Sequence, residues 1–184
     1  MIDAGQAHNM PDPRDVLRSR ARALARSVEP ADAVQASLTV LEFKLGAERY
    51  AVELQYVIEV LALQMLTPLP CTPPFIAGLV NVRGRIVTVL DLTRLFGLPE
   101  SGLTDLHRVI HVEGHGLDLG LLADTSIGVN TIALAALQPT LPTAAGRRAD
   151  YVQGITGDPI MLLDMPRILT DPGITVHEEV DNQA

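Results

Sequence analysis

Residues 73–95 read PPFIAGLVNVRGRIVTVLDLTRL, and this stretch decides the fold. Its two apolar runs, Phe75–Val80 and Ile86–Leu90, are rich in branched side chains, which is typical of β-strands. The segment NVRGR between them predicts a turn, in which Gly84 supplies the positive φ that tight turns favour. Asp91 follows the second run and is placed to cap a short helical turn. The stretch therefore predicts a strand, an arginine-bearing turn, a second strand and a capped helix.

The composition indicates a globular protein with few aromatic side chains. Of the 184 residues, 47% are hydrophobic and 20% are charged, which is enough apolar material for one substantial core or two small ones. Only 3% are aromatic and there is no tryptophan, so the chain lacks the aromatic faces on which bases and sugars stack. The net charge of −8 argues against a general affinity for nucleic acid.

Charge is distributed unevenly along the chain. Residues 1–36 hold five arginines and five acidic residues, so the whole net charge of −8 lies in residues 37–184. That part has nine basic residues against seventeen acidic ones, and three of the nine are Arg83, Arg85 and Arg94. Arginines gathered in an acidic domain favour a contact surface. The alternative is a solvated turn, because turns are normally polar and exposed.

An amphipathic helix is predicted near the N-terminus, between Asp12 and Val28. Apolar residues recur on one face of this segment, and arginines recur every fourth residue on another. Such a helix could dock on a partner, bind an anionic surface, or lie on the surface of its own domain with its arginines in water. Its apolar face is mostly alanine, which is too thin for stable membrane binding unaided.

The domain boundaries follow from a change of hydrophobic period. Residues 29–36 have the composition of a linker, and at Leu38 the period changes from that of a helix to that of a strand. The last residues are acidic and without periodicity. We therefore expect an N-terminal tail with an arginine-rich helix and linker at 1–36, a main domain at 37–172 and an acidic tail at 173–184.

The main domain contains an internal repeat, with a first unit at about 38–98 and a second at about 106–170. FIAGLV and VTVLDLTRL of the first unit match YVQGIT and IMLLDMPRI of the second. The first unit is longer by three residues, which fall in the NVRGR turn. Two similar units of short strands predict two small β-barrels packed together, because closure removes exposed strand edges. The matched turn glycines and helix-capping aspartates are Gly78 with Gly154 and Asp91 with Asp164.

The histidines around position 111 are the best candidates for a metal site, but their spacing argues against one. His107, His111, Glu113 and His115 alternate along a predicted strand and would share one face. At about 3.3 Å per residue, the outer two histidines are too far apart to bind one ion. Histidines on the solvent-exposed face of a strand are the preferred interpretation, and a metal-dependent enzyme is disfavoured.

The sequence holds no catalytic constellation. It has no nucleophile-elbow, phosphate-loop, dinucleotide-binding or zinc-protease motif. Cys71 is the single cysteine, and no neighbour in the sequence would activate its thiol. We expect no enzymatic activity and no cofactor. The start of the chain has no secretory pattern and no run reaches about 18 apolar residues, which predicts a soluble cytoplasmic protein.

Three segments together resemble the CheW-type chemotaxis coupling proteins: FKLGAERYAVELQYVIEV, TPLPCTPPFIAGLVNVRGRIVTVLDLTRLFG and YVQGITGDPIMLLDMPRIL. The resemblance covers roughly residues 38–169. It implies a mainly β protein with two five-stranded barrels and short capping helices, and no enzymatic activity. It also implies an adaptor in two-component signal transduction, recruited to receptor arrays at the membrane. Such an adaptor binds the cytoplasmic tip of methyl-accepting chemotaxis receptors and the regulatory domain of a CheA-type histidine kinase.

The resemblance further implies a receptor-binding surface around the arginine turn. Receptor tips are helical hairpins, so an adaptor needs an apolar groove flanked by fixed charges. Valines on the neighbouring strands would supply the apolar contacts, and Arg83 would hold carboxylates or helix-end carbonyls in its planar fork. The kinase would bind elsewhere, through apolar barrel ends or edges. An alternative is a small-ligand-binding regulatory β-barrel protein whose pocket is the cleft between the barrels. The expected receptor-binding residues are Val57, Glu59, Asn81, Val82, Arg83, Gly84 and Val87.

Overall fold

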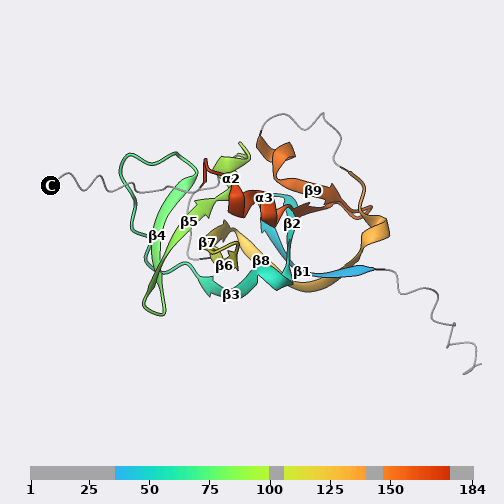
Figure 1. Cartoon of the computed structure of the whole chain (residues 1–184), viewed down its shortest axis with the longest axis horizontal. Coiled ribbons are helices and arrows are strands. Elements are labelled where there is room, and N and C mark those ends of the chain that lie inside the picture. Colours follow the sequence, from blue (N-terminus) through green and yellow to red (C-terminus); the bar gives the residue numbers. More distant parts are fainter. Residues whose placement is uncertain (1–35, 100–105, 140–146, 175–184) are drawn as a thin grey trace, which may run out of the picture. The chain divides into compact units, whose positions relative to one another are not determined.

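The computed structural model describes residues 36–99, 106–139 and 147–174, and Figure 1 shows their arrangement. The helix expected between Asp12 and Val28 lies outside these residues, as does most of the acidic tail. The described residues are mainly β and form two sheets of five strands each. Five short helices are η1 (Leu54–Tyr56), α2 (Leu92–Leu95), η2 (Leu134–Ala136), η3 (Arg147–Asp150) and α3 (Met165–Thr170).

The two sheets have the same strand arrangement. Sheet A has the order β8-β1-β2-β10-β9 and sheet B the order β3-β6-β7-β5-β4. In each sheet, neighbouring strands are antiparallel except for one parallel pair. This pair is β2 with β10 in sheet A and β5 with β7 in sheet B. The strands of sheet A are β1 (Ser37–Leu45), β2 (Glu48–Glu53), β8 (Thr125–Ala133), β9 (Val152–Ile155) and β10 (Ile160–Leu163). Those of sheet B are β3 (Val57–Ala62), β4 (Ile76–Val82), β5 (Arg85–Asp91), β6 (Arg108–Gly114) and β7 (Leu117–Ala123).

The two units of the sequence repeat exchange their first hairpins. Hairpin β1–β2 of the first unit pairs with β8 and β10 of the second, and hairpin β6–β7 of the second pairs with β3 and β5 of the first. The expectation that residues 38–98 and 106–170 would each form a barrel is therefore wrong. The repeat aligns equivalent strands, but each sheet combines strands from both units.

The expectation of closed barrels also needs correction. Within the described residues, the outer strands of each sheet are joined only by an isolated bridge. Thr67, beyond the end of β3, pairs with Leu79 of β4, and Gln138, beyond the end of β8, pairs with Ile155 of β9. Each sheet thus bends around its own interior without continuous pairing between its edges.

One large core lies between the sheets and a smaller core lies inside each of them. Because neighbouring residues on a strand point to opposite faces, the central strands bury one face in the shared core and the other in the interior of their own sheet. The shared core includes the fully buried Phe43, Tyr50, Leu90, Ile110, Leu121 and Leu163. The interior of sheet B consists of Val80, Val82, Val87, Val89, Val109 and Leu122. The interior of sheet A consists of Val40, Ala51, Ile132, Ile160 and Leu162.

The paired aspartates and glycines occupy equivalent places in the two sheets. Asp91 and Asp164 are the N-cap residues of α2 and α3, and each accepts a hydrogen bond at 3.1 Å from the backbone N–H three residues later. Gly78 and Gly154 lie next to the isolated bridges. A Cβ on Gly78 would stand 2.3 Å from the carbonyl oxygen of Thr67, and a Cβ on Gly154 would stand 3.0 Å from that of Gln138. Both glycines therefore allow the close backbone approach that joins the sheet edges.

Candidate functional site

The arginine turn is the tip of the β4–β5 hairpin, at the left of Figure 1. Only two residues connect the strands, Arg83 with a φ of 52° and Gly84 with a φ of 88°. Positive φ at both central positions is typical of a type I′ turn, which matches the twist of the flanking strands. The Oδ1 of Asn81 accepts a hydrogen bond of 2.7 Å from the backbone N–H of Gly84. The tip is therefore a tight turn with a fixed conformation.

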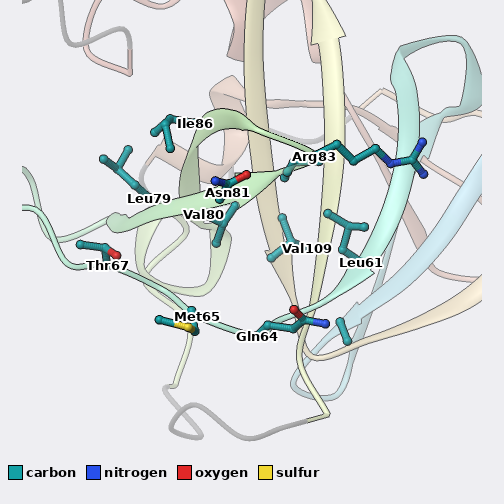
Figure 2. A pocket seen from close by; sticks show the side chains of 12 residues that line it. Leu61, Gln64, Met65, Thr67, Leu79, Val80, Asn81, Arg83, Ile86 and Val109 are labelled. Atoms are coloured by element: carbon teal, nitrogen blue, oxygen red, sulfur yellow. The ribbon is translucent and has the colours of Figure 1, made fainter.

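Arg83 connects the two edges of sheet B. Its Nη2 lies 2.7 Å from Oε2 of Glu59 on β3, while the hairpin that carries it forms the opposite edge of the sheet. In Figure 2 the Arg83 side chain extends from the turn toward this strand. The arginine side chain is 81% exposed and that of Glu59 is 18% exposed. The pair thus holds a cationic side chain in one place while leaving most of it accessible.

A second ion pair lies beside the first. Nη2 of Arg85, at the start of β5, lies 2.7 Å from Oδ2 of Asp118 on β7. The other carboxylate oxygen of Asp118 lies 4.0 Å from Nε2 of His111, which is buried on β6. Two adjacent arginines of the hairpin tip are therefore each paired with a carboxylate from another strand of sheet B.

An apolar groove of about 600 Å³ lies between the hairpin and the segment that follows β3. Figure 2 shows Met65 and Gln64 on one side and Leu79, Val80 and Ile86 on the other. The side chains of Met65 and Ile86 are large, apolar and exposed by 83% and 63%. We call this feature the edge groove. Its lining residues are Leu61, Ala62, Gln64, Met65, Thr67, Leu79, Val80, Asn81, Val82, Arg83, Ile86 and Val109.

The apolar contacts expected from Val82 and Val87 are wrong. These side chains are 3% and 1% exposed and belong to the interior of sheet B, and Val57 is half-buried against the shared core. The segment NVRGR predicts a turn of five residues, whereas Val82 pairs with Arg85 and only two residues intervene. That register turns both valines inward and leaves Ile86 on the outer face.

Exposed apolar residues on β3 and β8 were missed by the sequence analysis. Ile58 and Val60 on β3 are 53% and 37% exposed, and Ile127 and Val129 on β8 are 48% and 62% exposed. The registers with β6 and β1 place Val60 opposite Ile110 and Val129 opposite Leu41, which are equivalent positions in the two sheets. Both strands carry the chain from one sheet to the other. The alternation within VIEV and SIGV was the signal that could have identified them. We call these four residues the crossover residues.

The histidines are not on a solvent-exposed face, contrary to expectation. His107 and His111 are 6% and 2% exposed, because both faces of β6 are covered, and only His115 is exposed in the β6–β7 turn. Nε2 of His107 lies 3.2 Å from Oδ1 of Asp124, whose other oxygen accepts from the backbone N–H of Gly46 at 2.5 Å. The described residues contain no group of three histidine, cysteine or acidic side chains that could hold a metal ion.

None of the helices in residues 36–99, 106–139 and 147–174 is long and apolar enough to cross a membrane. Cys71 is exposed and adopts a φ of 62° in the segment between β3 and β4.

Known proteins resemble this chain over the part that forms the two sheets. Residues 39–173 match the family model of the CheW-like domain. The chain belongs to the CheW-like family. The match begins two residues into β1 and includes the other strands of the two sheets and both capped helices, and the site described above lies wholly within it.

Relatives of this CheW-like protein come from several bacteria. It is 34% identical to the protein FrzA of Myxococcus xanthus over 61% of this chain and 70% of that protein. It is 27% identical to the chemotaxis protein CheW of Thermotoga maritima over 82% of this chain and 97% of that protein. The crystal structure of the scaffolding protein TtCheW from Thermoanaerobacter tengcongensis superimposes with a TM-score of 0.66 at 30% identity, covering 75% of this chain and 96% of that one.

Proposed function

We propose that this CheW-like protein is a non-enzymatic adaptor that couples methyl-accepting chemotaxis receptors to a CheA-type histidine kinase. The observation that carries the proposal is the Arg83–Glu59 pair at the tip of a fixed hairpin, beside exposed apolar side chains, in a chain of the CheW-like family. The relatives include chemotaxis proteins, and one is called a scaffolding protein. An adaptor of this kind would be recruited to receptor arrays at the membrane.

The receptor tip is proposed to bind at Arg83, Glu59 and Asn81 together with the crossover residues. A helical hairpin buries apolar side chains in a partner and presents polar ends to fixed charges. The 81% exposure of Arg83 leaves its guanidinium accessible, and its pairing with Glu59 sets its direction at little further cost in conformational entropy. Because Val82 and Val87 are buried, the apolar contacts are proposed to come from Ile58, Val60, Ile127 and Val129. Gly84 contributes through the turn that fixes Arg83.

The kinase regulatory domain is proposed to bind at the edge groove. Met65 and Ile86 are large exposed apolar residues at the open edge of sheet B, and residues of this kind form the centres of protein interfaces. Methionine adapts its shape to a partner surface at little energetic cost. Since Asn81 and Arg83 also line the groove, the two proposed surfaces are neighbours.

A small-ligand-binding regulatory protein is the second candidate, and the volume of the edge groove favours it. About 600 Å³ falls within the range of small-molecule sites, which is roughly 300 to 1,000 Å³. The groove lies at the edge of sheet B, not between two barrels as the sequence analysis expected. Its opening to solvent and its shortage of converging polar groups make it a better protein-docking surface than a ligand site.

Two independent titrations test the proposed function, one with a receptor tip fragment and one with a kinase regulatory domain from the same organism. The double variant Arg83→Ala, Glu59→Ala should weaken receptor binding about 30-fold, which corresponds to roughly 2 kcal/mol. Kinase binding should stay within about threefold of the unchanged protein, because the kinase is proposed to contact Met65 and Ile86 and not Arg83, although Arg83 also lines the groove. The matched control is Arg167→Ala, which removes an exposed, aspartate-paired arginine from the second unit.

The reverse experiment replaces Met65 and Ile86 by serine. Kinase binding should fall and receptor binding should persist, because neither residue belongs to the proposed receptor surface. Parallel loss of both partners in either variant, with a native circular dichroism spectrum, would contradict the division of surfaces. Normal receptor affinity in the double variant would reject Arg83 and Glu59 as receptor contacts. A small-molecule thermal shift abolished by the Met65 and Ile86 variant would support the second candidate.

A further inference from the structure

The imidazole of His111 is buried and has no hydrogen-bond partner in the described part of the chain. The residue is 2% exposed, and neither Nδ1 nor Nε2 is bonded. A buried polar group without a partner costs free energy, so each such case in a folded protein needs an explanation. Histidine is also the side chain that changes charge between about pH 5 and 8. Its surroundings therefore decide whether it can take up a proton.

Two carboxylates approach His111, one from each neighbouring strand. On β7, Oδ1 of Asp118 lies 4.0 Å from Nε2. On β3, Glu59 is directly opposite His111 in the antiparallel pairing, so their side chains share a face of the sheet. Directly opposed residues have Cβ atoms about 4.5–5.5 Å apart, which is within reach of a glutamate side chain. Asp118 thus stands near Nε2, and Glu59 is the acid on the other neighbouring strand.

Each of these carboxylates uses one oxygen for an arginine of the hairpin tip. Oε2 of Glu59 binds Arg83 and Oδ2 of Asp118 binds Arg85, both at 2.7 Å. In the described residues, Oε1 of Glu59 and Oδ1 of Asp118 have no hydrogen-bond donor. With Glu113, which lies two residues along β6 and directly opposite Asp118, these are the charged groups that face His111 from β3, β7, β5, β6 and the β4–β5 turn. Three acids and two arginines leave no net positive charge that would exclude a proton.

We propose that His111 is a proton-binding position that completes a chain of charges across the open edge of sheet B. A protonated imidazole carries two N–H donors and can serve the open oxygens of both carboxylates. The distance of 4.0 Å to Asp118 shortens to a hydrogen bond after a movement of about 1 Å. The completed order is Arg83, Glu59, His111, Asp118 and Arg85. Protonation then joins β3 to the β4–β5 hairpin through β6 and β7.

On the acidic side of the transition the hairpin tip is held by five linked charges, and on the alkaline side by two separate ion pairs. The inference concerns the chain alone and goes beyond the proposed function. If that function holds, it makes the presentation of Arg83 dependent on pH.

The test is a nuclear magnetic resonance titration of the full-length chain from pH 8 to pH 5.5. The imidazole signals of His111 and the backbone amide signals of Glu59, Gly84 and Asp118 should move with one shared midpoint. In His111→Val the amide transition should be lost. The control is His115→Asn, which removes the exposed histidine of the β6–β7 turn. In this variant the amide transition should remain.

Asp118→Asn is the second variant, and it keeps the proposal testable if His111→Val does not fold. Removing the carboxylate charge should move the His111 midpoint to lower pH, since an opposite charge close to the imidazole favours its protonated form. Three results would overturn the proposal. The first is a transition of the β4–β5 hairpin that persists unchanged in His111→Val, and the second is a His111 midpoint that is unchanged in Asp118→Asn. The third is a folded wild-type chain in which the His111 signals do not move down to pH 5.5.

Discussion

Sheets A and B are built alike but carry opposite charges at the same positions. In sheet A the acid Glu42 is buried on β1, Arg49 of β2 binds it at 2.5 Å, and Arg49 also binds Asp158 at 2.9 Å. The registers place His111, Asp118 and Arg85 of sheet B at the equivalent positions. An arginine between two acids in one sheet therefore corresponds to an aspartate between a histidine and an arginine in the other.

The comparison shows which parts of the repeat are kept for folding and which have diverged. The bridge glycines and capping aspartates are the same in both sheets, and they determine how the chain turns and where sheet edges meet. The divergent residues lie on the central strands β1, β2, β6 and β7 and on the edge strands β3 and β8. There Glu59 of sheet B corresponds by register to Gly128 of sheet A, which cannot pair with an arginine. Of the two hairpins, β4–β5 in sheet B is the longer, with seven residues in each strand against four in β9 and β10, and it carries the paired arginines.

The bridge glycines should show the largest difference between the sheets. Gly78→Ala should lower the free energy of unfolding by at least about 3 kcal/mol, because the new Cβ meets a backbone oxygen and the residue has a φ of 145°. Gly154→Ala should cost clearly less, since its Cβ would stand 3.0 Å from the nearest backbone oxygen. Urea denaturation of both variants measures the two values. Equal losses would mean that the edges of the two sheets are equally tolerant.

The capping aspartates should be equal between the sheets. Asp91→Ala and Asp164→Ala should each cost about 1 kcal/mol, because each removes the acceptor of one helix N-terminal N–H group. Denaturation midpoints compared with wild type give both losses. A protein that lost stability at only one of the two positions would contradict the equivalence of α2 and α3.

The smallest effect at neutral pH is expected at Tyr50 of sheet A, whose counterpart in sheet B is Leu119. Burial, and then the hydrogen bond that its hydroxyl donates to Glu48, raises the pKa of Tyr50. Tyr50→Phe should cost less than about 1 kcal/mol near pH 7, because one hydrogen bond is lost.

At alkaline pH the same variant should become the more resistant protein. An unfolded tyrosine ionises near pH ~10, whereas folded Tyr50 keeps its proton to higher pH. The unfolded state therefore loses the proton first, and wild-type stability falls as pH rises through this interval. Tyr50→Phe should remove most of that fall in thermal unfolding curves. Tyr56, whose pKa burial also raises, remains in place and accounts for a residual slope. An unchanged alkaline slope would show that Tyr50 ionises freely in the folded protein.

The local elements and the repeat were predictable from the sequence, whereas the exchange of hairpins was not. Period-two patterns and turn glycines are encoded by neighbouring residues, and Asp91 and Asp164 stand directly before their helices. An exchanged and an unexchanged arrangement contain the same β1–β2 and β6–β7 hairpins, so local patterns do not distinguish them. Only contacts between distant segments decide, such as β2 against β10.

The candidate site was predicted in its charges but not in its apolar part. Arg83 pairs with Glu59, and Asn81 accepts a hydrogen bond from Gly84 in the turn that carries Arg83. Val82 and Val87 were placed on the wrong face, because a turn of two residues and a turn of five give different registers. The burial of His111 could not be anticipated, since the pattern of β6 does not reveal that both of its faces are covered.

The exchange of hairpins also sets the order in which the sheets can form during synthesis. Sheet B uses residues 57–123, one continuous stretch, whereas sheet A needs residues 37–53 and then 125–163. Since a chain is synthesised at roughly 5–20 residues per second, both edges of the β1–β2 hairpin stay unpaired for several seconds. A two-stranded hairpin is marginally stable alone, and its open edges can pair with other chains. The last strand of sheet A to be synthesised is β10, and it lies between β2 and β9. Sheet A is therefore completed at an inner position and not at its edge.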